Sequence, residues 1–443
     1  MSFKSHFAIT LGKSSQWFLH TFLKGGSSLP GKIALSIDPN VLEELSSGYE
    51  IIVVTGTNGK TLTTSIIVNI LKQQYGQIVT NPTGANMKQG IVATFLAAPK
   101  NKGGKKFAVL EVDEASLVHV AKLLKPNVFV FTNIFRDQLD RYGEIYTTYQ
   151  LIASGARQVP EATVIANGDT PIFNDTSLEN PHVYYGFNHK EDSELMADAN
   201  TDGVLCPHCQ HILHYKMNTY ANLGKYYCPN CDFKRPKLTT QLTDLVEITE
   251  KSATFIVDDQ QYHIEVGGLY NIYNALAAIA VGEFYNIDKE NIVKGLQESQ
   301  QVFGRQEVID VDGKKVTIML VKNPVGLNQV LETIRLAPQP FGLISLLNDQ
   351  YADGIDVSWI WDGHYEKLSE MNIPHVISGG RRVKDMSLRL KVAGLEDRLV
   401  EETDFKNLVS DIKEMPTDHI YVLATYTAML ELRQLFKEKG YLK

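Results

Sequence analysis

The chain has 443 residues, of which 44% are hydrophobic and 21% charged, so it has the length of about three domains and the composition of a folded protein. Its net charge of −8 argues against general affinity for nucleic acid or anionic lipid, although it does not exclude a local basic patch. The four cysteines fall in two short pairs, and no uncharged apolar run reaches about 18 residues, which excludes a disulfide framework and an ordinary transmembrane helix.

Residues 1–50 are expected to form a helical and loop segment that packs on the domain after it. Basic side chains interrupt any signal-peptide core here, so we expect a cytoplasmic protein. Trp17, Phe18, Phe22 and Leu23 recur at helical spacing and form an apolar stripe. The stripe either binds a partner protein or a membrane surface, or it packs into the protein's own core. We favour the second interpretation because globular helices normally bury such a stripe.

From residue 51 onward, short apolar runs alternate with helical segments. The runs predicted as buried strands are 51–54, 107–112, 128–133 and 163–167. This alternation indicates a parallel α/β sheet, which we assign to a central domain over 51–305. The same alternation restarts with 316–321, 341–347, 375–380 and 420–426. We therefore expect a smaller, Rossmann-like α/β domain over 306–443.

The segment VVTGTNGKTLTTS (53–65) has the pattern of a phosphate-binding loop, in which a strand, a glycine turn and a helix follow one another. Glycines let backbone N–H groups approach phosphate oxygens, the lysine neutralises phosphate charge, and the next hydroxyl can ligate Mg²⁺. Val54 stands where the general motif has glycine. The residues expected to bind ATP here are Gly56, Thr57, Asn58, Gly59, Lys60 and Thr61, with Thr61 also a magnesium ligand.

The cysteines lie in CPHC (206–209) and CPNC (228–231), at a spacing typical of a four-cysteine zinc site. We expect an inserted zinc ribbon over 200–238, with structural Zn²⁺ held by Cys206, Cys209, Cys228 and Cys231. A redox dithiol is the alternative, which two matched pairs disfavour. The segment is locally basic, but four thiolates close the site to water. We therefore expect a structural role and no nucleic-acid partner.

Six segments together resemble the Mur ligase family, the ATP-dependent enzymes that join amino acids to peptidoglycan precursors, with the folylpolyglutamate synthases among them. These segments are GTNGKT (56–61), EVDEAS (111–116), TNIFRDQLDRYGE (132–144), NGDTP (167–171), NIYNALAA (271–278) and GRQE (304–307). The resemblance implies ATP and Mg²⁺ as cofactors, and a Mur-ligase-type central ATPase domain.

The same resemblance implies roles for four residues. Glu111 would bind Mg²⁺, Asn167 and Asn271 would lie near the nucleotide base, and Arg305 would contact the ATP phosphates. The residue pattern independently favours Glu111, because a carboxylate that ends a buried strand beside a phosphate loop suits Mg²⁺. The neighbouring Asp113 and Glu114 compete for that role.

The pattern also departs from the amino-acid-adding members of the family. Gln138 stands where those enzymes usually have histidine, and no lysine can be placed as the one that becomes carbamylated. Both departures argue against ordinary amino-acid ligation. A stand-alone ligase of the Mur or folylpolyglutamate synthase type remains the alternative, and a nucleic-acid-binding ATPase is a third.

More narrowly, the whole chain resembles the synthetase subunits of lipid II isoglutaminyl synthase, with KNPVGLNQ (322–329) and NDQYADGIDVSWIWD (348–362) in the C-terminal domain. This implies ATP-dependent amidation of the α-carboxyl of D-glutamate in the lipid II stem peptide, through an acyl phosphate, to give D-isoglutamine. The enzyme would act at the inner face of the membrane, on lipid II as substrate.

The nucleophile for glutamine hydrolysis has to be a cysteine, and all four cysteines lie in the two knuckles. A partner subunit is therefore expected to supply ammonia, and the resemblance identifies a GatD-like glutamine amidotransferase in a heterodimer. By the same resemblance Asp356 would complete the partner's catalytic Cys-His pair, with Asp353 and Asp349 as rivals. Trp359 and Trp361 suit either an interface or the domain core.

Overall fold

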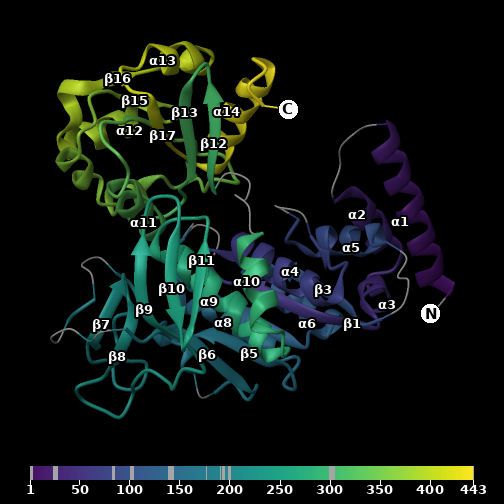
Figure 1. The fold of residues 1–443 in the computed structure, drawn as a ribbon. Helices are drawn as coiled ribbons and strands as arrows, with labels where there is room; N and C mark the ends of the chain where they lie inside the picture. The colour runs from purple at the N-terminus through teal and green to yellow at the C-terminus, as the bar shows by residue number, and fades with distance from the viewer. Residues whose placement is uncertain are drawn as a thin grey trace.

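The computed structural model describes residues 3–22, 28–81, 85–99, 104–137, 144–175, 177–189, 191, 195–197, 201–298 and 305–442. The side chains of His20, Phe22 and Arg305 lie outside this description. Two α/β units follow one another along the chain, and Figure 1 shows the C-terminal unit stacked on the larger central one. In the described part of the chain, no helix combines the length and the apolar character needed to cross a bilayer.

The central unit is built on a nine-stranded sheet with the order β11-β10-β9-β6-β5-β4-β1-β3-β2. The strands are β1 (Tyr49–Thr55), β2 (Val79–Thr80), β3 (Lys106–Glu111), β4 (Val128–Phe131), β5 (Thr163–Asn167), β6 (His182–Phe187), β9 (Thr240–Ile248), β10 (Ala253–Val257) and β11 (Gln260–Ile264). From β2 to β9 neighbouring strands run parallel, whereas β10 and β11 end the sheet as an antiparallel meander. The expected parallel α/β sheet is confirmed.

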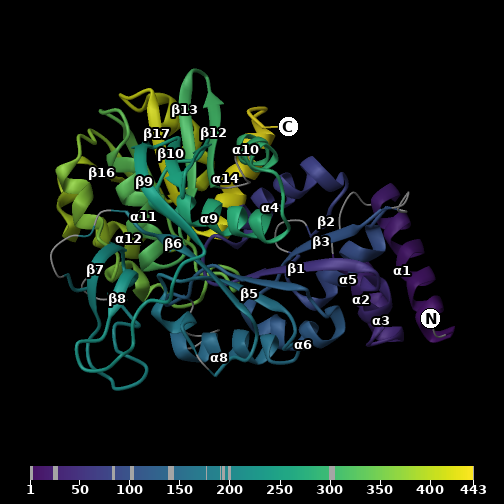
Figure 2. The ribbon, with the colours of Figure 1, turned by 60° about the horizontal axis from the view of Figure 1, so that its bottom comes forward.

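Helices cover both faces of this sheet, as the apolar strands require, because a parallel sheet has to bury both its sides. One face packs against α4 (Lys60–Tyr75), α9 (Leu269–Phe284) and α10 (Lys289–Gln297). The other packs against α5 (Lys88–Ala97), α6 (Glu114–Leu124) and α8 (Ile145–Ala156). Figure 2 shows the two helical layers on either side of the strands. The loops that follow β1, β3 and β4 therefore meet at one edge of the sheet.

The N-terminal helices α1 (Phe3–Phe22), α2 (Leu29–Ile37) and α3 (Val41–Ser46) pack on the central unit next to α5. α1 buries Ala8 and Gly12 toward this layer. Our expectation that its aromatic stripe packs inward is wrong, because Trp17 and Phe18 are 66% and 51% exposed. Small residues form the inward face of α1 and let it approach its neighbours closely. Leu23 and the Phe22 side chain lie outside the described residues.

The C-terminal unit contains a six-stranded sheet with the order β12-β13-β17-β14-β15-β16. Its strands are β12 (Arg305–Val311), β13 (Lys314–Leu320), β14 (Gly342–Leu346), β15 (Val376–Gly379), β16 (Leu399–Glu401) and β17 (His419–Ala424), and its helices α11 (Pro324–Arg335), α12 (Val383–Leu390), α13 (Leu408–Glu414) and α14 (Tyr426–Glu438). All pairs except β12–β13 are parallel. Arg305, which we assigned to the central domain, pairs its backbone with Met319 in this second sheet.

A two-stranded hairpin, β7 (His214–Tyr220) and β8 (Leu223–Tyr227), is inserted between β6 and β9. Its sheet is separate from the large ones, and it carries the two cysteine knuckles at its base. The hairpin lies at the end of the central sheet farthest from α1 (Figure 1).

Close packing of α2 on α5 predicts a sensitive glycine. A Cβ added at Gly31 would lie 1.8 Å from the backbone oxygen of Gln89, and a backbone atom cannot move aside cheaply. We expect Gly31→Ala to lower the free energy of unfolding by about 1–3 kcal/mol, as overpacked sites do. Ser36→Ala on the exposed side of the same helix is the matched control and should change it by less than about 0.5 kcal/mol. Urea denaturation measures both, and equal effects would contradict this packing.

Candidate active site

The two glycines of the loop between β1 and α4 pack closely against neighbouring segments. Gly59 has a φ of +84°, and a Cβ there would lie 2.0 Å from Oδ1 of Asn274. Gly56 has a φ of +127°, and a Cβ there would lie 2.4 Å from Oγ1 of Thr132. Both positions therefore require glycine for backbone conformation and for space. Directly after the loop, α4 begins at Lys60, which gives the loop a helix N-terminus for anion binding.

The segment after β4 holds this loop in place. The backbone N–H of Asn58 donates to Oδ1 of Asn133 at 2.9 Å, and the Asn133 amide donates back to the Asn58 carbonyl at 3.1 Å. The Thr57 N–H donates to the Asn133 carbonyl at 2.8 Å. The Phe135 N–H donates to the Thr57 hydroxyl at 3.1 Å. The segment 132–135 after β4 therefore fixes the backbone of the phosphate loop, a role that the sequence did not reveal.

Three carboxylates lie close to the ammonium group of Lys60. Nζ of Lys60 is buried and donates to the Gly56 carbonyl at 2.5 Å and to both Glu114 oxygens at 3.2 Å. Burial lowers the pKa of Lys60, but attraction to Glu114, Glu111 and Asp113 outweighs it, so the net shift is upward. Burial raises the pKa of Glu114, and Lys60 opposes that shift. Lys60 is therefore held as a cation.

The structure separates the three carboxylates that competed for the magnesium role. Glu114 forms the ion pair with Lys60, and Asp113 caps α6 by accepting from the Ala115 N–H at 3.2 Å. Glu111 ends β3, where its backbone exchanges hydrogen bonds of 2.8 and 2.9 Å with the Asn81 side chain. Among the described residues, none donates to the Glu111 carboxylate. Its oxygens are thus available to a metal ion.

Two asparagines on α9 link this helix to the loop. Asn274 accepts a hydrogen bond from the Thr63 hydroxyl at 3.3 Å and lies against Gly59. Behind it, Asn271 accepts from the Asn274 amide at 3.2 Å and donates to the Gly267 carbonyl at 2.6 Å. We named Asn271 from the resemblance and missed Asn274. The i, i+3 spacing within NIYNALAA, which places both on one helix face, was the available signal.

Asn167 lies fully buried at the end of β5, where its Oδ1 accepts from the Asp169 N–H at 3.1 Å. In the described part of the chain, no acceptor faces its amide nitrogen. The amide nitrogen thus retains both of its N–H donors. Thr61 is partly exposed in the first turn of α4. The Arg305 side chain and Gln138 lie outside the described residues, so the expectations for them stay untested.

A cavity opens beside the loop between the two α/β units. Asn58, Gly59 and Asn274 form its wall on the central side, and Lys322 and Gln329 contribute from the C-terminal side. Its remaining lining is mainly apolar and aromatic, from Phe135, Tyr220, Tyr270, Met319, Leu320, Val325 and Val330. Apolar walls with a few convergent amides and one cation suit a ligand with a flat ring and charged groups. Asn167 and Asn271 do not reach this lining.

The C-terminal unit contacts the loop directly through the start of α11. The Lys322 ammonium donates to Oδ2 of Asp137 at 2.5 Å and to the Thr57 carbonyl at 3.3 Å. The amide of Asn323 pairs reciprocally with that of Asn58, at 3.1 and 3.4 Å. These two residues belong to KNPVGLNQ, but the sequence did not indicate that they touch the phosphate loop. A second cation is thereby placed next to the loop.

Arg136 forms another bridge between the units. Its Nη2 pairs with Asp362 of the C-terminal unit at 2.5 Å, and its Nε lies 3.5 Å from Asp202 near the inserted hairpin. In the sequence, Arg136 directly follows the segment 132–135 that fixes the phosphate loop. The loop, the hairpin and the C-terminal unit are therefore connected through a few polar contacts at one edge of the sheet.

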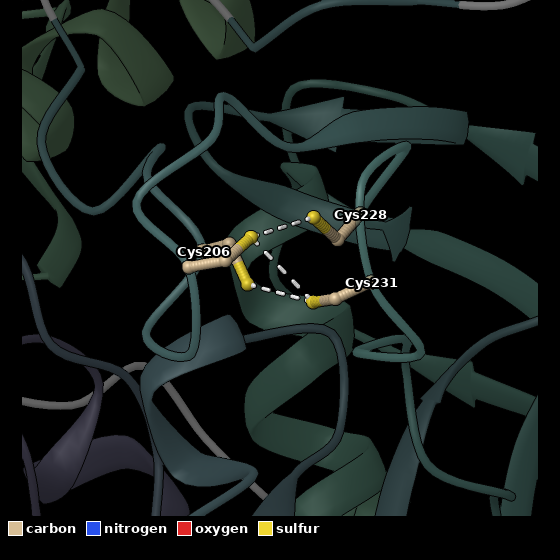
Figure 3. Close-up of side chains that lie close together, drawn as sticks. Cys206, Cys228 and Cys231 are labelled. Carbon is tan, nitrogen blue, oxygen red and sulfur yellow. Dashed lines mark hydrogen bonds between the residues drawn. The ribbon is translucent and has the colours of Figure 1, made fainter.

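The four cysteines form one cluster in which all Sγ atoms lie within 4.8 Å of one another. Individual Sγ···Sγ distances are 3.5 Å for Cys206 and Cys231, 3.4 Å for Cys209 and Cys228, and 3.6 Å for Cys209 and Cys231. Figure 3 shows side chains from the two knuckles pointing toward one another. Sulfur atoms ~3.8 Å apart surround a tetrahedral zinc ion with Zn–S bonds of ~2.3 Å, whereas a disulfide needs ~2.05 Å.

The donor set therefore fits a metal ion. The thiols differ in their pKa shifts: the backbone N–H of His211 lowers the pKa of Cys209 to about 5, whereas burial raises that of Cys206. The Phe233 N–H lowers the pKa of Cys231, but burial and the neighbouring thiols outweigh it, so the net shift is upward. Cys209 is thus the thiol most readily present as the thiolate that binds metal. Cys206 and Cys228 are buried in a small apolar cluster with Tyr226 and Phe233. Such a small hairpin has little core of its own, so a bound metal would contribute strongly to its stability.

The aspartates near residue 356 differ sharply in environment. Asp353 is buried and accepts from the backbone N–H groups of Thr427 at 2.7 Å and Gln350 at 3.1 Å. Asp349 pairs with Arg382 at 3.1 Å. Asp356 is exposed, and among the described residues it binds within its own turn alone, where it accepts from the Ser358 N–H and hydroxyl at 2.8 and 2.9 Å.

Of the two tryptophans in this segment, Trp359 is half-buried and packs on the core of the C-terminal unit. Trp361 is 48% exposed, while Tyr351 and Ile355 on the same segment are 74% and 61% exposed. Asp356 thus lies on a surface with several exposed apolar side chains, in contrast to the buried Asp353.

Comparison with known proteins places this arrangement in a family. The model of the Mur ligase middle domain matches residues 54–282, and the model of the MurT ligase C-terminal domain matches residues 320–429. The fold resembles a pseudomurein peptide ligase type C from Methanothermus fervidus (TM-score 0.67, 22% identity, 91% of this chain and 81% of that one). It also resembles folylpolyglutamate synthase of Mycobacterium tuberculosis complexed with ADP and AMPPCP (0.62, 14%, 97% and 99%).

Sequence relatives are closer. The chain is 50% identical to the Streptococcus pneumoniae "Lipid II isoglutaminyl synthase (glutamine-hydrolyzing) subunit MurT", over 99% of this chain and 98% of the relative. Identity to the Staphylococcus aureus (strain N315) subunit of the same name is 35%, over 90% of each chain. The resemblance inferred from the motifs is confirmed, and Mur ligases use ATP and Mg²⁺. With its Mur-type phosphate loop and its matching C-terminal unit, the chain belongs to the MurT family of Mur-ligase-type, ATP-dependent ligases.

Proposed function

We propose that this chain is the synthetase subunit of a lipid II isoglutaminyl synthase. It would amidate the α-carboxyl of D-glutamate in the lipid II stem peptide to D-isoglutamine, with ATP as energy source and ammonia from a GatD-like glutaminase. One observation carries the proposal: a Mur-type phosphate loop occurs in a chain whose four cysteines all lie in one metal-type cluster. The name of the relatives, which specifies glutamine hydrolysis, supports it.

The chemistry needs two steps, because a carboxylate is a poor electrophile. The substrate carboxylate oxygen would attack the γ-phosphorus of ATP, ADP would leave, and an acyl phosphate would form. Ammonia would then attack the carbonyl carbon, phosphate would leave with the bond electrons, and the nitrogen would lose a proton. Lys60 and Lys322 lie beside the loop, where their charges would offset the negative charge that develops on the transferred phosphoryl group.

The phosphate loop offers the groups that ATP and Mg²⁺ require. We propose that Gly56, Thr57, Asn58, Gly59, Lys60 and Thr61 hold the phosphates, with Asn167, Asn271 and Arg305 as further nucleotide contacts. Thr61 and Glu111 would hold Mg²⁺, which when bound neutralises phosphate charge. The available oxygens of Glu111 support this assignment, and the Glu114–Lys60 and Asp113–Ala115 contacts argue against the two neighbouring carboxylates. Asn274 would fix Gly59 and, as part of the cavity wall, could also face the nucleotide.

Ammonia has to come from outside the chain. A glutaminase needs a reactive cysteine, and the four thiols face one another rather than a histidine. We propose a heterodimer in which Asp356 orients the catalytic histidine of the GatD-like partner. Its exposure, beside the exposed Tyr351, Ile355 and Trp361, supports this role over the buried Asp353. The complex would act in the cytoplasm at the inner membrane face, where lipid II would present its stem peptide.

The test is to co-purify the chain with a GatD-like subunit and to measure lipid II amidation with ATP and glutamine by mass spectrometry. We expect amidation to require both subunits when glutamine is the donor, and the synthetase alone to use ammonium salts. If the chain alone consumed ATP with a free amino acid and lengthened a peptide, the proposal would be wrong. The alternative of a stand-alone amino-acid ligase, which the Mur-ligase fold also allows, would then hold.

Substitutions at the loop separate ATP chemistry from folding. We expect Glu111→Gln to lower ammonia-driven amidation by about 100-fold or more, because Mg²⁺ would lose a charged ligand, and Lys60→Ala to lower it similarly. Glu111→Gln should lower the melting temperature only slightly, because its carboxylate accepts no hydrogen bond from a described residue and only adds to the attraction that holds Lys60. Lys72→Ala, on an exposed position of the same helix as Lys60, is the matched control and should keep full activity. Near-normal activity of Glu111→Gln would contradict the magnesium assignment.

Asp356→Asn tests the shared glutaminase site. It keeps an oxygen for the Ser358 N–H but loses the charge that would stabilise a protonated histidine of the partner. We expect glutamine-driven amidation to fall by about 100-fold or more, whereas ammonia-driven amidation stays within about twofold. Asp349→Asn is the control, because Asp349 already pairs with Arg382, and it should retain glutamine use. An equal loss with both nitrogen donors would show a merely structural role.

Metal analysis tests the cysteine cluster, in which we propose structural Zn²⁺. Protein prepared under reducing conditions should contain about one zinc per chain by inductively coupled plasma mass spectrometry, since four thiolates form one tetrahedral site. Cys209→Ser should lower the zinc content and the melting temperature. His211→Ala should lower neither, because its exposed ring lies outside the cluster. A wild-type protein free of metal would exclude a zinc site.

A further inference from the structure

One face of α1 exposes a row of large apolar side chains. Phe3, Phe7, Leu11, Trp17 and Phe18, which we call the outer face of α1, are 89%, 52%, 42%, 66% and 51% exposed. At about 100° per residue these positions lie on one side of the helix. The opposite side supplies the residues buried against α2 and α5. Figure 2 shows α1 at the rim of the molecule, and the exposed fractions place these five side chains on the solvent side of the helix. The polar Thr10 and Ser14 also lie within this face, but their hydroxyls donate to backbone carbonyls of the same helix, at 2.8 and 2.9 Å. A largely apolar exposed face of this kind is typical of an interaction surface.

The charges around the outer face share one sign. In a chain of net charge −8, the sequence of α1 contains no acidic residue. Lys4 is exposed on one flank of the outer face, and His6 and Lys13 are exposed on the other. Aromatic and aliphatic side chains bordered by lysines are the pattern of a helix that lies in the plane of a membrane interface. The local charge thus departs from the acidic average of the chain and complements anionic lipid.

The position of α1 relates this face to the proposed active site. Gly12 of α1 packs against Leu96 of α5. Near the other end of α5, the backbone carbonyl of Asn86, two residues before the helix begins, accepts a hydrogen bond from the Asp113 N–H, close to Glu111. The ten residues of α5 span ~15 Å. Gly12 therefore lies about one length of α5 from the edge of the sheet where the substrate carboxylate would react, and the outer face lies ~10 Å farther away, on the opposite side of α1.

We propose that the outer face of α1 binds the surface of an anionic lipid bilayer and holds the enzyme where its lipid-linked substrate is embedded. This inference rests on the proposed function, since the relatives' names identify lipid II as the substrate. Apolar side chains enter the boundary between headgroups and acyl chains, while Lys4 and Lys13 contact lipid phosphates. A single short apolar face with few charges gives weak, reversible and salt-sensitive binding.

A second copy of the chain fits this face less well. A helix of twenty residues is ~30 Å long and ~10 Å wide, so it offers ~300 Å² to a partner. Stable dimers bury about 800 Å² on each side. Two copies would also bring lysines of both chains together without an acidic residue on either helix. A bilayer has neither restriction, because it surrounds the apolar side chains and supplies negative charge.

The experiment is co-sedimentation of the full-length chain with vesicles made of phosphatidylglycerol and phosphatidylcholine in equal parts. We expect binding to these vesicles, little binding to pure phosphatidylcholine, and loss of binding as salt concentration rises. The double variant Phe7→Ser, Trp17→Ser should bind at least about tenfold more weakly. The matched control is Leu388→Ser, Val392→Ser on the C-terminal unit, whose side chains are 55% and 59% exposed. It should bind like the wild type.

A second variant tests the charges. Lys4→Gln, Lys13→Gln should weaken binding by about fivefold for each lysine and reduce the salt dependence. Because all four substituted residues are exposed, melting temperatures should stay unchanged, which separates lost binding from misfolding. Equal vesicle binding by wild type and both variants would overturn the proposal. The proposal would also be overturned if the wild type formed concentration-dependent dimers that the Phe7→Ser, Trp17→Ser variant does not form. It would likewise be overturned if that variant no longer bound the glutaminase subunit.

Activity assays distinguish this inference from the proposed function. With lipid II embedded in vesicles, the Phe7→Ser, Trp17→Ser complex should amidate more slowly than the wild type, whereas both should react equally with lipid II in detergent micelles. Equal rates in both settings would overturn the membrane role while leaving the amidation proposal intact. Vesicle binding through α1 without any amidation would overturn the amidation proposal and leave the membrane binding of α1 in place.

Discussion

The site depends on a glycine loop that both α/β units hold at once. Gly59 lies against Asn274 with no room for a side chain, and Asn133 binds the loop backbone in both directions. From the other unit, Asn323 pairs with Asn58. Such bonds fix the backbone before a ligand arrives, so less ordering is needed on binding. They also tie the position of the C-terminal unit to that of the loop, since Lys322 reaches the loop only when that unit is docked.

The charged side chains around the loop are also held in place by neighbouring groups before a ligand binds. The buried ammonium of Lys60 carries a desolvation penalty, which the Gly56 carbonyl and the Glu114 carboxylate offset. The pair therefore adds little net stability, but it fixes the lysine side chain beside the loop. Glu111 is held differently, because Asn81 fixes its backbone and leaves its carboxylate available. One carboxylate thus positions the cation, while the other accepts no hydrogen bond from a described residue.

The two ends of the molecule, on either side of the phosphate loop, each expose side chains that suit binding to another molecule. At the C-terminal end, Asp356 is exposed on a surface with apolar side chains, as a residue that serves a partner must be. At the N-terminal end, small residues let α1 pack closely and turn its aromatic side chains outward. In the proposed enzyme, nitrogen arrives from one end and the lipid-linked substrate is held at the other. The central sheet places the loop between them.

The sequence by itself determined the fold class, the phosphate loop and the cysteine cluster, because each is a local pattern. Apolar runs in alternation with helices specify a parallel sheet, glycines before Lys60 specify a loop, and the spacing of two CxxC pairs brings four sulfurs together. The family followed from the same motifs.

Only the tertiary structure decided which contacts each of several similar residues makes. Asp113, Glu114 and Glu111 are adjacent in sequence, but a helix cap, an ion pair and a strand end separate them in space. Asn274 and Lys322 reached the loop through packing between distant segments, which no local pattern encodes. The outward stripe of α1 was misjudged for the same reason. Periodicity shows that a helix has an apolar side, but which side is buried depends on the neighbours that the fold brings to it.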